Sequence, residues 1–429
     1  MTMTTMALPV LRSVLPVLLS ATVIVASGAA PAAASPAPDP VLATLMPVPA
    51  GQLTVTAVDA APLGVIAGTA SVQVTNPDGT VSTVSTPQRW ARVPRLGWVR
   101  QPLALPDGAT SGVVDGLTNA IEAAGRVTVD GVSRAVRWSA SGLSSTLIGD
   151  AATGVTAVGP HGPWGVATDT AQLPASGYAE LVTRDGTRTL LAGTPELDAG
   201  YRRTVGSIGG PATALVWVTD GVGMGTTARP VLWVSGATQR LPVVSSYFLR
   251  SACVSPVLAD GSVVSSGYTI DGGTVALVMV RHVGGVPGTN VELSRATAAG
   301  QPVAGLACTS GFKPDNLAAD GGIAGFVTDA EGTRAAYWNA ANERTLVPLA
   351  AGERSAKGVA VANGGRMVIQ AEAEDGSVRL SLWHNGLLRS LTTPDGWSVS
   401  SVVELTDHRL LVANVRDASG AVRPAVWEL

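Results

Sequence analysis

The sequence predicts an all-β fold built from one repeated unit, and three observations carry this prediction. A segment with arginine four residues before a tryptophan recurs five times, at 134–138, 229–233, 334–338, 379–383 and 423–427. Turns rich in Asn, Asp and Gly separate short apolar runs, as two-residue hairpins require. No long stretch between the repeats shows helical periodicity, and only 116–124 comes close.

The spacing of the tryptophans predicts the architecture. Trp90 and Trp138 are 48 residues apart, and Trp338, Trp383 and Trp427 follow at intervals of 45 and 44. The longer gaps between Trp138, Trp233 and Trp338 each hold two periods, with 178–182 and 275–279 as the degenerate middle strands. Because this is the period of a four-stranded blade, we expect a β-propeller of about eight four-stranded blades, with seven as the alternative.

Each unit resolves into four short strands. The clearest unit has strands at 358–361, 366–370, 379–383 and 387–391. The strands are apolar on both faces, which is typical of sheets packed between two others. We expect the tryptophan to fill the wedge between blades, and the arginine before it to contact the acidic turn of its hairpin.

The two chain ends predict how the ring closes. The last unit stops at 427–429 after three strands and lacks its fourth. Residues 44–51 closely match 345–352, which form a fourth strand and its exit loop. We therefore expect an N-terminal strand to complete the C-terminal blade, so that residues 41–429 form a single domain without exposed edges.

The N-terminus predicts export. Arg12 precedes an apolar run at 14–25 and a small-residue stretch that ends at Ala34, the expected cleavage site, so residues 1–34 read as a signal peptide. Residues 35–40 form a Pro/Ala-rich tether. The alternative is a retained membrane anchor. We expect a secreted, extracellular and monomeric protein without a membrane span after signal cleavage.

Composition limits the partners. Hydrophobic residues make up 46% of the chain, charged residues 14%, and the net charge is −3, which gives no field that would attract nucleic acid. Lys313 and Lys357 are the only lysines, so nearly all positive charge is arginine. Cys253 and Cys308 are the only cysteines; in an exported protein an even count favours a disulfide, and two buried free thiols are the alternative.

No motif for catalysis or cofactor binding is present. The chain has no nucleophile elbow, phosphate loop, zinc helix or calcium loop. Its four histidines, His161, His282, His384 and His408, fall in different units, and we expect them in loops or at strand ends. We therefore predict no catalytic residues, no metal site and no cofactor, although a ring can gather distant residues at its axis.

Propellers usually bind ligands with the loops that enter the first strand of each blade. In a chain with 4% aromatic residues, five residues of these loops are candidates for a binding face: Tyr201, Arg202, Tyr247, Arg250 and Trp397. The alternative is that the aromatic rings only cover loop backbone.

The Arg-Ala-Val-x-Trp strand at 134–138, preceded by a hairpin that contains glycine, resembles the HAF-type repeats of secreted bacterial proteins. The resemblance implies a propeller-like fold and an extracellular setting, and it transfers no catalytic residue. We expect a non-catalytic binding module for a glycan, a cell-envelope component or a protein. The alternatives are a glycan lyase or hydrolase with its site at the channel, and a structural surface protein. Paired carboxylates at the channel would favour the enzyme, and aromatic rings the binder.

Overall fold

A computed structural model describes residues 39–51, 54–148, 153–168, 179–191, 202–220, 227–246, 252–271, 274–308 and 315–429. The chain divides into two units, Met1–Ala37 and Pro38–Leu429, and every described residue belongs to the second. The predicted signal peptide and residues 35–38 of the predicted tether lie outside the described residues. Among the residues that are described, no helix is long and apolar enough to cross a membrane.

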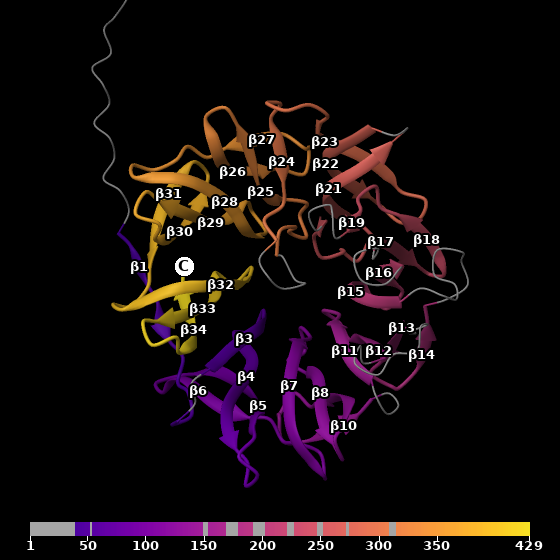
Figure 1. The fold of residues 1–429 in the computed structure, drawn as a ribbon, viewed down its shortest axis with the longest axis vertical. Coiled ribbons are helices and arrows are strands. Elements are labelled where there is room, and N and C mark those ends of the chain that lie inside the picture. Colours follow the sequence, from indigo (N-terminus) through magenta and orange to yellow (C-terminus); the bar gives the residue numbers. More distant parts are fainter. Residues whose placement is uncertain are drawn as a thin grey trace, which may run out of the picture. The chain divides into compact units, whose positions relative to one another are not determined.

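The described chain is all-β, and its strands form antiparallel groups of four in chain order (Figure 1). The first groups are β3 (Thr54–Ala61), β4 (Val65–Thr75), β5 (Val81–Val93) and β6 (Gly97–Pro102); β7 (Ala109–Leu117), β8 (Ala123–Val129), β9 (Val132–Trp138) and β10 (Ser145–Leu147); β11 (Thr153–Val158), β12 (Pro163–Thr168), β13 (Ala179–Thr183) and β14 (Arg188–Leu190); and β15 (Arg202–Gly210), β16 (Thr213–Asp220), β17 (Thr227–Val234) and β18 (Ala237–Arg240), with β19 (Ser245–Ser246) beside β17.

The same pattern continues to the C-terminus. The later groups are β20 (Cys253–Val254), β21 (Val263–Asp271), β22 (Thr274–Val283) and β23 (Thr289–Ala296); β24 (Val303–Gly305), β25 (Ile323–Asp329), β26 (Gly332–Trp338) and β27 (Arg344–Leu346); β28 (Glu353–Ala362), β29 (Arg366–Ala373), β30 (Val378–His384) and β31 (Leu387–Thr392); and β32 (Trp397–Leu405), β33 (Leu410–Asp417) and β34 (Val422–Glu428). Single parallel bridges, Thr333 with Ser355 and Thr54 with Val422, join two pairs of groups into larger sheets.

The strand at the N-terminus pairs with the last strand of the chain. In β2 (Thr44–Leu45), Thr44 lies opposite Val426 and Leu45 opposite Ala425, and the Met46 amide donates to the Pro424 carbonyl at 2.9 Å. The predicted pairing of the two ends is therefore confirmed. A further strand, β1 (Val41–Leu42), was not expected from the sequence; it runs parallel to β31 in the preceding group.

The repeated tryptophans are core residues, as predicted. Trp90, Trp138, Trp338 and Trp427 are at most 1% exposed. Three of their indole nitrogens donate to the main-chain carbonyl of a segment that enters the same group, at Pro47, Ala104 and Thr392. These three tryptophans therefore stabilise the entry of their own groups as well as filling the core.

In one unit the arginine of the repeat contacts the acidic turn, as the sequence predicts. Arg334 forms ion pairs with Asp329 at 2.5 Å and with Glu331 at 2.6 Å across the β25–β26 turn.

In the β20–β23 group, the strand that replaces the Arg–Trp segment is displaced from the position that the sequence predicted. Segment 275–279 lies within β22, but its last residue, Met279, does not occupy the tryptophan position. In the β24–β27 group Ile323 pairs with Trp338, whereas here Val263 pairs with His282. His282 is the penultimate residue of β22, in line with the expected strand-end position, and it is 1% exposed. Its ring nitrogens contact Asn290 Oδ1 and the Gly285 carbonyl.

Candidate functional site

The first strands of the groups share a bulge near their C-terminal ends. One extra residue shifts the pairing with the second strand in β3, β7, β11, β15, β28 and β32. A bulge redirects the side chain beside it and bends the strand. The residues that follow these bulges are Asp59, Gly116, Ala157, Ser207, Ala360 and Glu404.

The polar side chains at this position bind the backbone of the next group. The Leu117 amide of β7 donates to Asp59 Oδ2 at 2.8 Å, and the Ala60 amide of β3 donates to Glu404 Oε2 at 2.8 Å. The Val257 amide, which follows β20, donates to Ser207 Oγ at 3.1 Å. Side chains placed by the bulges therefore connect consecutive groups by hydrogen bonds.

Ala360, which follows the bulge of β28, has no polar side chain, and Asp315 beside it provides a hydrogen-bond acceptor instead. Its backbone bridges to Ala360 of β28, and its carboxylate accepts a hydrogen bond of 3.0 Å from the Leu405 amide at the end of β32. Two segments separated by 90 residues in the sequence are thereby joined.

Asp59, Asp315 and Glu404 line one hollow of about 260 Å³, and we call them the carboxylate cluster. Burial raises the pKa of Asp315 to about 7, against the hydrogen bond from Leu405, and the negative charges of Asp59 and Asp407 raise it further. Burial, then the charges of Asp59 and Asp315, hold the pKa of Glu404 well above its usual range. Burial and mutual repulsion therefore favour the protonated forms of Asp315 and Glu404.

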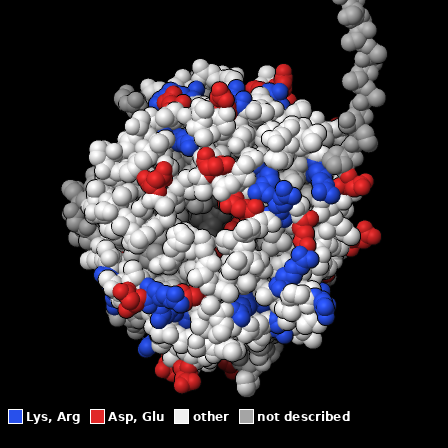
Figure 2. All heavy atoms as spheres, turned by 180° about the vertical axis from the view of Figure 1, so that it is seen from behind, with Lys and Arg blue, Asp and Glu red and all other residues white. Residues whose placement is uncertain are grey.

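The lining of this hollow has no histidine, lysine or arginine among the described residues. No group of three or more His, Cys, Asp or Glu side chains in the described chain is arranged to hold a metal ion. Figure 2 shows a hollow near the middle of the face opposite to that of Figure 1, with acidic side chains close by. On that face charged side chains are otherwise scattered among uncharged ones.

A larger groove, of about 800 Å³, is lined by first strands (β20, β24, β28 and β32), by second strands (β21, β25 and β29) and by the third strand β22. Its aromatic lining is Tyr268 of β21 and Phe326 of β25, both half-buried. Its polar side chains include Thr328, Gln370 and Ser400. This volume is within the range of small-ligand sites.

Lys357, on β28, is the one charged side chain in the lining of this groove among the described residues. Its ammonium lies 5.0 Å from the centroid of the Phe326 ring, a distance at which the cation is attracted to the ring face. Lys357 lies opposite Gln370 in the pairing of β28 with β29.

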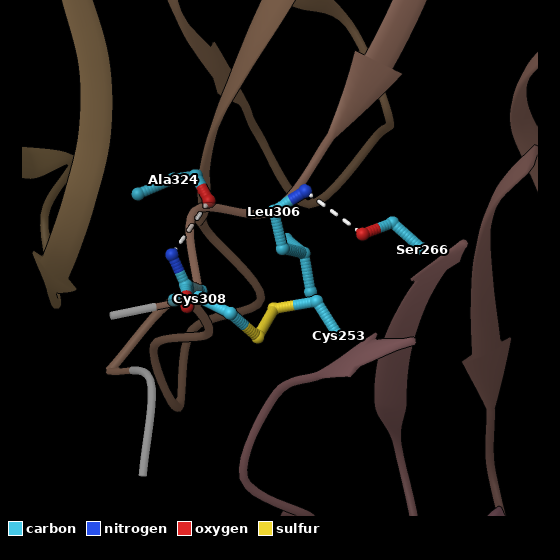
Figure 3. Close-up of a disulfide and its surroundings, with 6 residues drawn as sticks. Cys253, Ser266, Leu306, Cys308 and Ala324 are labelled. Atoms are coloured by element: carbon cyan, nitrogen blue, oxygen red, sulfur yellow. Dashed lines mark hydrogen bonds between the residues drawn. A yellow bond between two sulfur atoms is a disulfide. The ribbon is translucent and has the colours of Figure 1, made fainter. Parts of the chain in front are cut away.

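A disulfide forms part of the groove wall. Cys253 of β20 is bonded to Cys308, which follows β24, so the predicted bridge is confirmed and links two consecutive groups (Figure 3). The Leu306 amide donates to Ser266 Oγ at 3.0 Å beside the bridge. The covalent bond and this hydrogen bond fix one side of the groove.

Three of the five predicted binding-face residues, Tyr201, Tyr247 and Arg250, lie outside the described residues. Arg202 is the first residue of β15, and Trp397 is the first residue of β32. The Trp397 ring packs against the core, and the guanidinium carbon of Arg423 lies 5.5 Å from its centroid. Trp397 lines neither the groove nor the hollow of the carboxylate cluster.

Sequence reasoning missed both the groove and the carboxylate cluster, although each left a signal. Asp59 and Glu404 are acidic residues inside otherwise apolar or small-residue strands. Lys357 is one of two lysines in a chain that otherwise uses arginine. The lining aromatic residues left no comparable signal, because Tyr268 and Phe326 lie within strands rather than loops.

No protein-family model matches the chain, and no curated protein matches it in sequence. Solved structures similar to it include Porphyromonas gingivalis dipeptidyl peptidase 4, at 11% identity, 82% coverage of this chain and TM-score 0.47. Another is the Vanderwaltozyma polyspora Nup133 β-propeller domain, at 10% identity, 73% coverage of this chain and TM-score 0.31. A third is a fucose-specific lectin from Aleuria aurantia, at 12% identity, 80% coverage of this chain and TM-score 0.29. This chain spans 58% of the peptidase and 97% of each of the other two chains.

Proposed function

We propose that residues 41–429 form one eight-bladed β-propeller, closed by β2 beside β34, and that the protein is an exported, monomeric, non-catalytic module that binds a glycan. The repeated groups of four strands and the pairing of the two chain ends support the architecture. The signal-peptide pattern at 1–34, the likeness to HAF-type repeats and the disulfide support export.

The groove beside the disulfide carries the functional proposal. It combines two aromatic side chains with hydroxyl and amide groups in a volume of about 800 Å³. Such a site can cover the apolar face of a sugar ring with an aromatic ring and bind its hydroxyls through side-chain hydrogen bonds. A glycan therefore fits the groove better than a purely apolar ligand.

The test is a glycan and peptidoglycan array probed with the purified protein that starts at residue 35. Tyr268→Ala removes one aromatic wall and should weaken binding at least tenfold. Leu63→Ala is the matched control, because Leu63 is 74% exposed and does not line the groove. Absence of any bound glycan, or equal binding by the Tyr268 variant, would contradict the proposal.

A glycan hydrolase is a second candidate, favoured by one observation. Asp315 has a pKa of about 7 in a hollow that it shares with Asp59 and Glu404, and a general acid requires such a raised pKa. In the described structure, however, all three carboxylates accept main-chain hydrogen bonds. Release of reducing ends from an array-positive glycan, abolished in Glu404→Gln, would support the enzyme; no release would exclude it for that glycan.

A further inference from the structure

Among the described residues that line the groove, Lys357 is the one charged side chain. No aspartate or glutamate belongs to its described lining, and Lys357 has no hydrogen bond or ion pair with any described residue. The Lys357 side chain is exposed at the groove. An ammonium in this setting is available to a ligand rather than committed to the fold.

The surroundings of Lys357 hold its charge in a defined place. The ammonium lies 5.0 Å from the Phe326 ring centroid, and its strand is paired with β29 through Gln370. Replacement of Gly358, which follows Lys357, would bring a Cβ within 3.1 Å of the Gly325 backbone, so the strand packs closely against the neighbouring group here. The lysine thus extends from a fixed stretch of backbone.

We propose that the groove binds an anionic saccharide, with Lys357 as the residue that pairs with the carboxylate or phosphate of the sugar. This inference rests on the proposed glycan-binding function and specifies its ligand. Tyr268 and Phe326 would cover the sugar ring, and Thr328, Gln370 and Ser400 would bind its hydroxyls. A lysine can pair with either anion as a compact charge with three donors, so it does not select between them by a fixed fork geometry.

The experiment compares saccharides that differ only in charge. Isothermal titration would measure binding of a uronic-acid oligosaccharide, its carboxyl-reduced neutral counterpart and a sugar phosphate of similar size. Wild type should bind at least one anionic probe tenfold or more tightly than the neutral one. That preference should decline as sodium chloride rises from 0.05 to about 0.5 M, because salt screens an exposed ion pair. The uronate and phosphate arms identify which anion the site prefers.

Three variants test whether Lys357 causes the preference for anionic saccharides. Lys357→Gln should remove both the anionic preference and its salt dependence, while Lys357→Arg should retain most of the preference because it keeps the charge. Tyr268→Ala should weaken binding of the anionic and neutral saccharides alike. Thermal melting should show that all three variants fold, since Lys357 and Tyr268 are not fully buried.

The outcomes separate this inference from the function on which it rests. If the neutral oligosaccharide binds as tightly as the uronate and the sugar phosphate, and binding still depends on Tyr268, the anionic specificity is wrong and glycan binding stands. If Lys357→Gln keeps the anionic preference, Lys357 is not its source and the inference is overturned. If no saccharide binds, both proposals fail.

Discussion

The first strands use their two regions differently, and β32 shows the contrast within one strand. Ser400 is exposed at the groove, whereas Glu404, four residues later, accepts a hydrogen bond from the backbone of β3. At about 3.3 Å per residue these positions are roughly 13 Å apart. Glu404 thus holds two neighbouring groups together, whereas Ser400 of the same strand remains available at the groove.

The difference follows from what each polar group contacts. A buried main-chain amide without an acceptor is costly, so an acceptor at the end of the strand stabilises the neighbouring group. Ser400 and Lys357 are exposed at the groove instead, and neither side chain is hydrogen-bonded to a described main-chain amide, so their loss leaves no buried amide unpaired. Changes at the C-terminal ends of the first strands should therefore affect stability, and changes at the groove should affect binding.

The largest effect is expected where the two chain ends pair. A protein that starts at residue 47 lacks β1 and β2 and loses Met46, which is 1% exposed, together with its bond to Pro424. We expect the free energy of unfolding to fall by about 5 kcal/mol, because a buried side chain and two strand pairings are lost. Urea unfolding measures the change. A protein that starts at residue 39 is the control and should match the chain that starts at residue 35; equal stability of all three would contradict closure through β2.

The next effect is the pH dependence caused by the carboxylate cluster. Because the folded state raises the pKa of Asp315 to about 7 and that of Glu404 well above its usual range, it binds more protons than the unfolded chain between about pH 4 and 7. The free energy of unfolding should therefore fall as pH rises through this window, by about 1.4 kcal/mol per pH unit for each proton of difference. The groups facing these carboxyls, Asp59 and Asp407, are also acidic and oppose ionisation.

Glu404→Gln tests whether the carboxylate cluster causes this pH dependence, because the amide oxygen of glutamine can still accept from the Ala60 amide but carries no charge. The variant should be more stable than wild type at pH 8 and close to it at pH 5, as measured by urea unfolding at both values. The exposed turn aspartates do not affect the comparison, because hydrogen bonds lower their pKa below the usual aspartate value, away from the pH range tested: Asp78, Asp185, Asp329, Asp375 and Asp417. A wild-type protein that becomes more stable between pH 5 and 8 would contradict the prediction.

A smaller effect is expected from a matched pair of serines. Ser207 follows a bulge of β15 and accepts from the Val257 amide, whereas Ser400 is the extra residue of the first of two bulges in β32 and is exposed at the groove. Ser207→Ala should cost about 1 to 2 kcal/mol of unfolding free energy, because the amide loses its acceptor. Ser400→Ala should cost less than about 0.5 kcal/mol. Equal costs would show that the two regions do not differ as described.

The sequence predicted the repeated features and not the individual ones. Period, turn residues and the Arg–Trp spacing recur in many units, so they predicted the strands, the buried tryptophans and the pairing of β2 with β34. The carboxylate cluster depends on single bulges that bring Asp59, Asp315 and Glu404 together from different groups, and no local pattern reports such contacts. The role of His282 in the tryptophan position was missed for a related reason, because a histidine there breaks the Arg–Trp repeat by which the units were recognised.

The smallest effect on stability is expected at Lys357. Lys357→Met keeps an unbranched side chain over the Phe326 ring and removes only a charge that has no ion pair among the described residues. The cation–π contact at an exposed site contributes about 0.5 to 1 kcal/mol, and the sulfur of methionine can replace part of it. We therefore expect the free energy of unfolding, measured with urea, to change by less than about 0.5 kcal/mol. Phe326→Ala is the contrast and should lower this free energy by more. A loss of 2 kcal/mol in Lys357→Met would place this lysine in the fold and remove the contrast between the two regions of the first strands.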